Sequence, residues 1–379
     1  PRQASNTGRM IMSIAEQMGF TLQKTAHSVN IKERLDFSCA IFDPKGNLVA
    51  NAPHMPVHLG SMDNSVETVV LLNKGKIFPG DVFVLNAPYN GGTHLPDINV
   101  ITPVFDEAGK EVLFYVASRG HHADVGGKAP GSITPFATTV DEEGVLIDNL
   151  KVVERGVFQE DALVKVLTDH PFPARNVPQN IAYLKAQVAA NEKGVQELTK
   201  AVRQFGLDVV QAYMAHVQDY ASERVRKAIS ELQDGEFETK TDQGAVIKIK
   251  VTIDREAREA TVDFTGTSPM QPTNFNAPRS IARAVVLYCF RLLVDEQIPM
   301  NAGCLRPVNI VIPDGTIFSP RYPAAVVAGS GETSSQAADA LLAALGVMGS
   351  HQGTMNNLTF GNNRYQYYET ICSGSPAGE

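Results

Sequence analysis

The sequence of 379 residues lacks the signals that mark membrane, secreted and nucleic-acid-binding proteins. No apolar run approaches the length of a membrane span, and no signal peptide opens the chain. The formal net charge of −8 argues against a general nucleic-acid binder, because such proteins carry a basic surface. We therefore expect neither a membrane nor a nucleic acid among the partners.

Cysteine and the common catalytic signatures are also scarce. The four cysteines are far apart and form no CxxC pair; they are Cys39, Cys289, Cys304 and Cys372. This usage predicts unpaired thiols in a reducing, cytoplasmic setting rather than a disulfide framework. There is no GxxxxGK[ST] motif for a nucleotide and no GxSxG motif for a nucleophilic serine.

Both ends of the sequence look cut. The chain starts at Pro1 rather than at methionine, and residues 373–379 form a glycine-containing run after an apparent strand. We expect the chain to be a piece, or a processed form, of something longer.

The periodicity of apolar residues predicts an α+β protein of several domains, with mixed β-sheets, hairpins and a long antiparallel helical pair. Three units are expected: an N-terminal α/β metal-site domain at 1–176, a helical hairpin at 177–235, and an incomplete C-terminal α/β domain at 236–379. The helical pair occupies 178–233 and divides at Gly206. The remaining helices are expected at 8–26, 61–74, 279–295 and 332–346, and the main strands at 37–42, 48–51, 82–86, 98–105, 111–118, 246–253, 259–264 and 308–312.

Two polar motifs flank one of these hairpins. HLPD at 94–97 precedes the first strand, and SRGHHAD at 118–124 follows the second, with a turn at 106–110 between them. A turn centred on Ala108 places Asp97 opposite Arg119 and His94 opposite His122. Imidazoles and carboxylates then meet at the open end of the hairpin, where they suit a divalent metal.

Six residues are candidates for that site: His94, Asp97, His121, His122, Asp124 and, from the mouth of another strand, Asp36. A mixed His/Asp set favours Mn²⁺, Fe²⁺ or Zn²⁺. Because side chains alternate along an extended chain, His121 and His122 cannot both point at one metal. Any of the six residues is also open to interpretation as a structural histidine or a cap.

Three other loops have two interpretations each. His54 and His58 lie among prolines, which favours structural loop histidines over ligands. The glycine-rich loop at 126–132 is interpreted as a connection rather than an oxyanion site. The Gly/Ser-rich stretch at 329–336 opens a helix, where N-capping by Ser or Thr is favoured over anion binding.

Long motifs spread over the chain closely resemble the hydantoinase B/5-oxoprolinase family, and within it the C-terminal half of the 5-oxoprolinase type. They lie at 12–19, 30–40, 51–60, 94–97, 118–124, 187–191, 206–214, 275–279 and 355–357. The resemblance covers nearly the whole chain. One departure is that the family continues Gly-Ala-Gly after the last strand, whereas this chain reads Gly374-Ser375-Pro376 and ends, so that closing elements are absent or lie on another piece.

The resemblance implies a division of labour with a hydantoinase A-type partner, which is a separate subunit or a fused domain. The partner binds ATP and phosphorylates the amide oxygen of a small cyclic amide such as 5-oxoproline, a hydantoin or a lactam. The B-type chain then supplies a metal and the hydrolytic half of the reaction within a hetero-oligomer.

The resemblance also implies roles for the motif residues. The metal ligands are Asp36, His94, Asp97 and one or both of His121 and His122. We assign His121 to the metal, and His122 and Asp124 to catalysis. Asp124 is also a candidate to bind a ligand from outside the metal's own coordination, or to bind a second metal. Two alternatives stay open: the large subunit of an ATP-dependent ketone (acetone-type) carboxylase, and a non-enzymatic scaffold with structural histidines.

Overall fold

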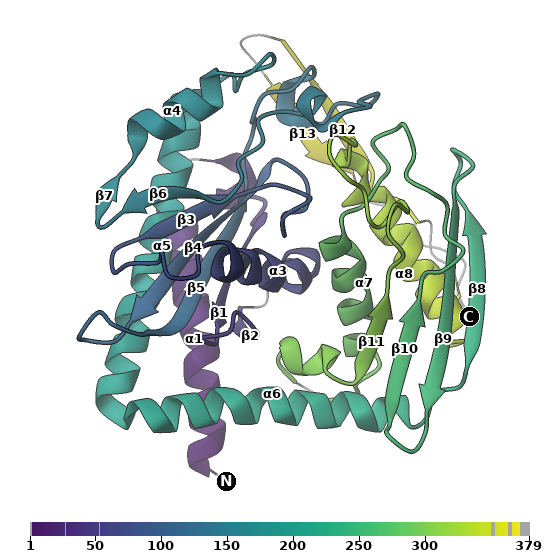
Figure 1. The fold of residues 1–379 in the computed structure, drawn as a ribbon, viewed down its shortest axis with the longest axis horizontal. Helices are drawn as coiled ribbons and strands as arrows, with labels where there is room; N and C mark the ends of the chain where they lie inside the picture. The colour runs from purple at the N-terminus through teal and green to yellow at the C-terminus, as the bar shows by residue number, and fades with distance from the viewer. Residues whose placement is uncertain are drawn as a thin grey trace.

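A seven-stranded antiparallel sheet occupies one side of the computed structural model, which describes residues 2–26, 28–52, 54–296, 298–349, 353–362 and 366–371 (Figure 1). The strand order is β2-β1-β5-β4-β3-β6-β7. The strands are β1 (Phe37–Phe42), β2 (Leu48–Asn51), β3 (Val82–Leu85), β4 (Asp97–Phe105), β5 (Val112–His121), β6 (Leu150–Glu154) and β7 (Val157–Phe158).

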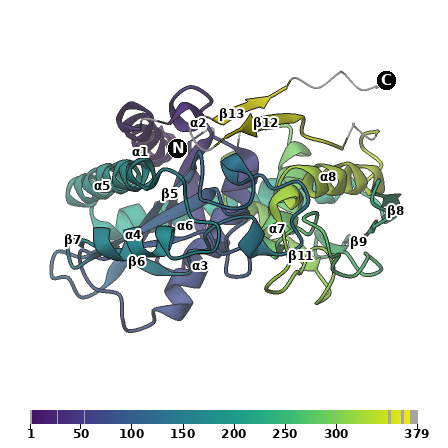
Figure 2. The ribbon, with the colours of Figure 1, turned by 90° about the horizontal axis from the view of Figure 1, so that it is seen from above.

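Helices cover both faces of this sheet, so its central strands are buried over most of their length. Helices α1 (Arg2–Thr25) and α5 (Val177–Phe205) lie on one face, and α3 (Pro56–Leu72) lies on the other (Figure 2). Because successive side chains of a strand point to opposite faces, Phe114 and Val116 of β5 join the core under α1 and α5, whereas Tyr115 and Ala117 join the core under α3. The site is built on the α3 face.

A four-stranded sheet forms the other side of the molecule. Its order is β11-β10-β9-β8, with β10 and β11 parallel and the other pairs antiparallel. Helices α7 and α8 pack on one face of this sheet and bury its apolar residues. The elements are β8 (Gly235–Lys240), β9 (Val246–Asp254), β10 (Glu259–Asp263), β11 (Val308–Val311), α7 (Arg279–Leu292) and α8 (Glu332–Ala344).

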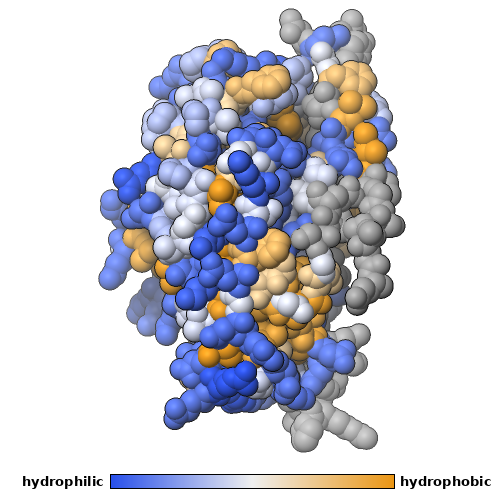
Figure 3. Space-filling model, turned by 90° about the vertical axis from the view of Figure 1, so that its right-hand side faces the viewer, coloured by the Kyte–Doolittle hydropathy of each residue, from blue (hydrophilic) through white to orange (hydrophobic). Residues whose placement is uncertain are grey.

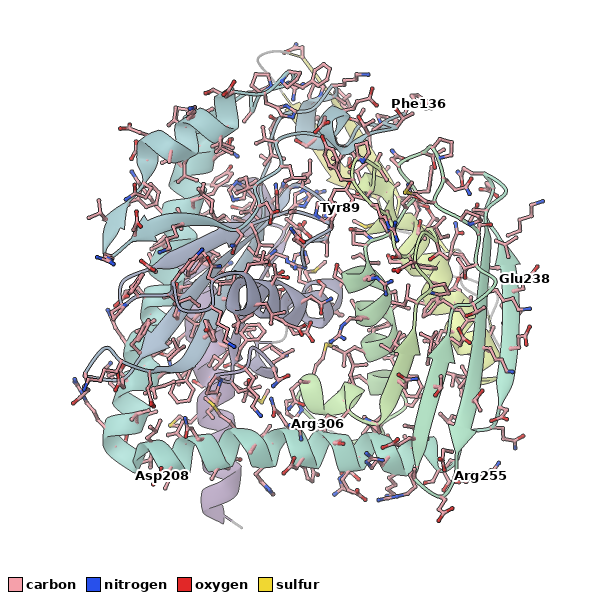
Figure 4. The ribbon with its side chains drawn as sticks, in the orientation of Figure 1. Tyr89, Phe136, Asp208, Glu238, Arg255 and Arg306 are labelled. Atoms are coloured by element: carbon pink, nitrogen blue, oxygen red, sulfur yellow. The ribbon has the colours of Figure 1, made fainter. Side chains whose placement is uncertain are left out.

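Helix α6 (Leu207–Ile229) connects the two sides and corrects one expectation. Helices α5 and α6 both exist and part at Gly206, but they do not lie side by side as an antiparallel pair; α6 runs along the base from one side to the other (Figure 1). The cause is a divided apolar face, since Met214 packs in the core under α1 whereas Val225 and Ile229 pack in the core of the second sheet. Arg306, labelled in Figure 4, holds α6 through Asp219 and Gln218.

Several shorter helices and one further hairpin lie outside the two large sheets. They are α2 (Val29–Lys32), α4 (Glu160–Thr168), the hairpin β12 (Asn357–Gly361) and β13 (Gln366–Thr370), and the 3-10 helices η1 (Pro130–Ser132), η2 (Val140–Glu142), η3 (Ala302–Leu305) and η4 (Val327–Gly329).

On the side seen in Figure 3, orange apolar groups interrupt the blue surface in a central patch and near the upper right edge.

The α+β class is confirmed, and the division at 176/177 and 235/236 stays a prediction. Within the described ranges, no helix combines the length and the apolar character needed to cross a membrane. Cys39, Cys289 and Cys304 are buried free thiols, as predicted, whereas Cys372 and the run at 373–379 fall outside the described residues.

Candidate metal centre

The hairpin of β4 and β5 brings the two motifs together, but in a different register from the expected one. Asp97 lies opposite His121, and Asn99, not Asp97, lies opposite Arg119. The turn closes where Asp106 accepts backbone hydrogen bonds from Lys110 and Glu111, and a bulge between Val104 and Phe105 shifts the pairing further. The sequence pattern located the hairpin, but it did not contain the bulge.

This register places a carboxylate and an imidazole on the same face of the sheet. Asp97 Oδ1 lies 3.0 Å from His121 Nδ1, and both side chains are buried beneath α3. Asp36 joins them because Phe37 pairs with Gly120, which brings the residue before β1 beside the end of β5. Its Oδ2 lies 3.8 Å from His121 Nδ1, and its side chain is 20% exposed, the most open of the group.

His94 arrives on a loop that requires glycine. A Cβ on Gly92 would lie 2.3 Å from the carbonyl oxygen of Asn86, so no larger residue fits there without moving the backbone. Ser280 of α7 donates a hydrogen bond to the carbonyl of Gly92, and the Asn86 amide donates to the carbonyl of Leu95. The loop is thus fixed from two sides, and it places His94 Nδ1 3.3 Å from Asp97 Oδ2.

His58 belongs to the same cluster, and the interpretation of it as a loop histidine was wrong. Helix α3 begins at Pro56 and therefore includes His58. Proline is favoured at the first position of a helix, because the backbone N–H that it lacks would have no partner there. His58 Nε2 lies 3.2 Å from Asp97 Oδ2 and 3.6 Å from Asp36 Oδ1. His54 remains in the loop, where its Nδ1 accepts a hydrogen bond from the Cys39 N–H.

The donor set fits a divalent transition metal. His94, Asp97 and His121 each offer one ligand atom, and these atoms lie within 4.8 Å of one another. Among the described side chains, His94 Nδ1 is one of the few buried polar atoms that make no hydrogen bond. Asp97 Oδ2 lies 3.3 Å away without forming a hydrogen bond to it, and a buried nitrogen that makes no hydrogen bond is costly, so a metal bound there would satisfy it. Nitrogen and carboxylate donors without thiolate suit Zn²⁺, Mn²⁺ or Fe²⁺.

Interactions within the cluster shift the pKa values of Asp97 and His121 in opposite directions. Burial raises the pKa of Asp97, but Coulombic interactions with the His94 and His58 rings and hydrogen bonds from His121 and His58 outweigh it, so that the pKa ends well below its usual range. Burial lowers the pKa of His121, but Asp36 and Asp97 more than reverse this and raise it. The cluster therefore holds Asp97 as an anion.

Arg119 lies on the same face of the sheet, fully buried under α3. Its guanidinium donates hydrogen bonds to the neutral oxygens of Asn99, Ser61 and Ser65. Burial lowers its pKa to about 10, although the negative charges of Asp97 and Asp63 oppose that shift. Arg119 therefore stays cationic near neutral pH and places a positive charge near the carboxylates of Asp97 and Asp63. The sequence placed Arg119 opposite Asp97 but did not predict this electrostatic role.

The structure does not bring His122 to the cluster. His122 points to the opposite face, where its ring lies 3.1 Å from the Gln187 side-chain oxygen and 3.1 Å from the Asn180 amide of α5. Burial lowers its pKa to about 4, which leaves the ring neutral. Alternation along β5 thus separates the two consecutive histidines, as the sequence pattern required.

Asp124 is also engaged elsewhere. Its carboxylate accepts hydrogen bonds from the Gly126 and Gly131 N–H groups and forms an ion pair with Arg175 at 2.8 Å. Two further N–H groups of the glycine-rich loop, those of Gly127 and Lys128, donate to the carbonyls of Phe172 and Glu142, which supports the interpretation of this loop as a connection. The capping prediction for 329–336 was wrong: Gly331 is the N-cap of α8 and no side chain caps the helix. Ser334 and Ser335 donate instead to the preceding carbonyls.

The chain is similar to several known proteins. A family profile described as hydantoinase B/oxoprolinase matches residues 2–379. 5-Oxoprolinase 1 of Arabidopsis thaliana is 48% identical over 99% of this chain, which spans only 31% of that relative. Among solved structures, the ATP-dependent caprolactamase from Pseudomonas jessenii matches 98% of this chain and 66% of its own, with a TM-score of 0.81 and 24% identity. A nucleotide-free acetone carboxylase matches 90% of this chain and 47% of its own, with a TM-score of 0.79 and 17% identity. At such identities, the last two likenesses show the fold alone.

Proposed function

The chain belongs to the hydantoinase B/oxoprolinase family, and from that premise we propose that it is the metal-dependent hydrolytic part of an ATP-dependent cyclic-amide hydrolase, with 5-oxoproline as the first candidate substrate. The observation that carries the proposal is the convergence of His94, Asp97 and His121 on one buried point, where His94 Nδ1 has no hydrogen-bond partner. Because the chain spans about a third of its 5-oxoprolinase relative, the activity of the whole protein needs more than these residues.

Asp36, His94, Asp97 and His121 would hold the metal. When bound, it supplies Lewis acidity to a carbonyl or water oxygen. His58 then has a separate role: a Ser38 hydroxyl that donates to Nδ1, 3.2 Å away, leaves the ring hydrogen on Nε2, which faces the two carboxylates. The histidine thus orients Asp97 and Asp36, as outer partners of ligands commonly do.

His122 and Asp124 act as positioning residues in this account, in place of the catalytic roles expected for them. His122 ties the end of β5 to α5, and Asp124 ties the following loop to Arg175. Both contacts fix the backbone that presents His121. Their loss should therefore affect metal retention before it affects any step of the reaction.

The ATP-dependent activation is assigned to a hydantoinase A-type portion, fused in the same chain or present as a separate subunit of a hetero-oligomer. This division is supported by the family and by the absence of a P-loop motif from the sequence. Three buried free thiols support a reducing, cytoplasmic setting.

The test is hydrolysis of 5-oxoproline, a hydantoin and a lactam by the full-length protein with its ATP-binding portion. ATP and divalent metal are varied independently, and His94→Ala serves as the inactive variant. The proposal expects ring opening that needs both ATP and metal. Incorporation of bicarbonate into acetone would instead support a carboxylase, and hydrolysis that survives complete chelation would exclude a metal-dependent site.

A further inference from the structure

The buried guanidinium of Arg119 contacts two serines that lie four residues apart on α3. Its Nη1 donates a hydrogen bond to Ser61 Oγ, and its Nη2 donates to Ser65 Oγ, 3.4 Å away. Residues four apart are neighbours on one face of a helix, so a single guanidinium reaches both hydroxyls. Its Nε donates in a third direction, to Asn99 Oδ1 on β4 at 2.7 Å. One side chain of β5 is thus bonded both to the helix and to the strand that begins at Asp97.

The Ser65 hydroxyl donates its hydrogen bond outside its own helix. A serine within a helix commonly donates to the carbonyl four residues earlier, as Ser61 does. Ser65 donates instead to the carbonyl of Gly91, 2.6 Å away, in the loop that leads to His94. Its oxygen accepts from Arg119 while its hydrogen is donated to Gly91, so both roles of this hydroxyl are fixed.

The contact lies three residues before His94, on backbone that packs directly against α3. A Cβ on Gly91 would lie 2.5 Å from the carbonyl oxygen of Asn64, and the positive φ of 85° also favours glycine there. Further along the loop, Thr93 Oγ1 donates to Asp97 Oδ2, 3.3 Å away. The short segment before His94 is therefore held at both of its ends. A shift of the Gly91 carbonyl would displace the imidazole that faces Asp97.

We propose that Arg119 and Ser65 are positioning residues that set the place of the His94 imidazole before a metal binds. The bond that Ser65 receives from a cation polarises its O–H group, which strengthens the bond to the Gly91 carbonyl. A residue of β5 thereby fixes a ligand that a separate loop carries. This inference rests on the proposed function and adds two residues to its metal centre.

The experiment removes the Ser65 hydroxyl from the full-length protein and examines the metal site without turnover. Ser65→Ala should lower the affinity for Zn²⁺ about tenfold or more, as the loss of an outer partner of a ligand does, measured against a competing chelator. At saturating Co²⁺, the visible absorption spectrum of this variant should move from that of the wild type toward that of His94→Ala, because the imidazole no longer keeps its place.

Ser334→Ala is the matched control. Ser334 is also a buried serine of a helix, but it donates to the carbonyl of Ser330, four residues earlier. This variant should keep the Zn²⁺ affinity and the Co²⁺ spectrum of the wild type while it loses a comparable part of its free energy of unfolding in urea. Arg119→Lys keeps the charge but loses the fork that reaches both Ser65 and Asn99, so it should also lower the Zn²⁺ affinity.

Each outcome supports or removes a part of the inference. Wild-type affinity and spectrum in Ser65→Ala would overturn the positioning role and leave the proposed metal centre standing. A weaker affinity with an unchanged Co²⁺ spectrum would show that His94 had kept its place, which also contradicts the inference. Wild-type affinity in Arg119→Lys would remove Arg119 from the role. A wild-type protein that binds neither Zn²⁺ nor Co²⁺ would overturn the proposed metal centre together with this inference.

Discussion

His58 Nε2 lies 3.2 Å from Asp97 Oδ2, although one residue is on the first turn of α3 and the other opens β4. The contact joins the helix that covers the sheet to the strand that carries the HLPD motif. The cluster therefore depends on the packing of this helix, the hairpin and the strand that follows Asp36.

His58→Ala should weaken metal binding about 10–100-fold, because an outer partner that orients a ligand carboxylate is lost. His54→Ala is the matched comparison, since His54 lies on the same segment but bonds to the Cys39 N–H instead of a carboxylate. Titration against a competing chelator measures both affinities. Equal affinities in the two variants would show that His58 does not act on the cluster.

Asp97→Asn should abolish metal retention through purification. The amide keeps the shape of the side chain but loses the charge that faces His58, His94 and His121. Elemental analysis of the folded protein provides the measurement. Asp63→Asn is the control, because Asp63 is also buried but pairs with Arg283 outside the cluster; a full metal complement in the Asp97 variant would contradict the assignment.

Metal affinity should fall as the pH decreases. Burial lowers the pKa of His121, but Asp36 and Asp97 raise it above its ordinary value, and a ligating imidazole must be neutral. Protons therefore compete with the metal below that raised pKa, and the apparent affinity should drop about tenfold per pH unit for one displaced proton. Chelator competition between about pH 5 and pH 8 tests this. A flat profile would remove His121 from the ligand set.

Glu143, which lies outside the metal cluster, should make the free energy of unfolding depend on pH. It is buried and accepts hydrogen bonds from the N–H groups of Val326 and Val327, across the junction of the two sides. Burial raises its pKa from 4.5 to about 8. The folded state thus binds this proton more tightly than the unfolded state, so the stabilisation is complete below about pH 4.5 and is lost as the pH rises to about 8.

Glu143→Gln keeps an oxygen acceptor and has no charge to lose. Between about pH 5 and pH 8, the wild type should lose on the order of 1–3 kcal/mol of unfolding free energy relative to this variant, as urea denaturation would measure. Glu142→Gln is the control, because a hydrogen bond from Lys128 lowers the pKa of Glu142 to about 2 and its contribution is constant over this range. Parallel curves for wild type and Glu143→Gln would contradict the prediction.

The spacing of apolar and polar residues predicted those parts of the site that lie within one strand or one hairpin. The hairpin, the strand after Asp36 and the alternation of His121 and His122 all follow from spacing within one segment, and the structure confirms each of them. Two contacts could not be predicted in this way because they arise from distant packing. His122 contacts Gln187 and Asp124 contacts Arg175, and these partners lie 65 and 51 residues further along the chain.

Two misses came from backbone detail. The prolines around His54 and His58 favour a loop, but proline is also favoured at the first position of a helix, and Pro56 opens α3 with His58 on its first turn. A bulge beside Phe105 moved the hairpin register, and with it the partner of Asp97. Proline at the start of a helical pattern is a signal that could have placed His58 on α3. The bulge has no such signal, because it depends on how the strand packs in the sheet.

Anomalous diffraction from crystals of the protein grown with Zn²⁺ or Mn²⁺ tests the central claim most directly. The account predicts one strong peak within about 2.0–2.3 Å of nitrogen and oxygen atoms of His94, Asp97 and His121. A fully ordered cluster with no peak, or a peak bound only by other residues, would contradict a metal centre at this place.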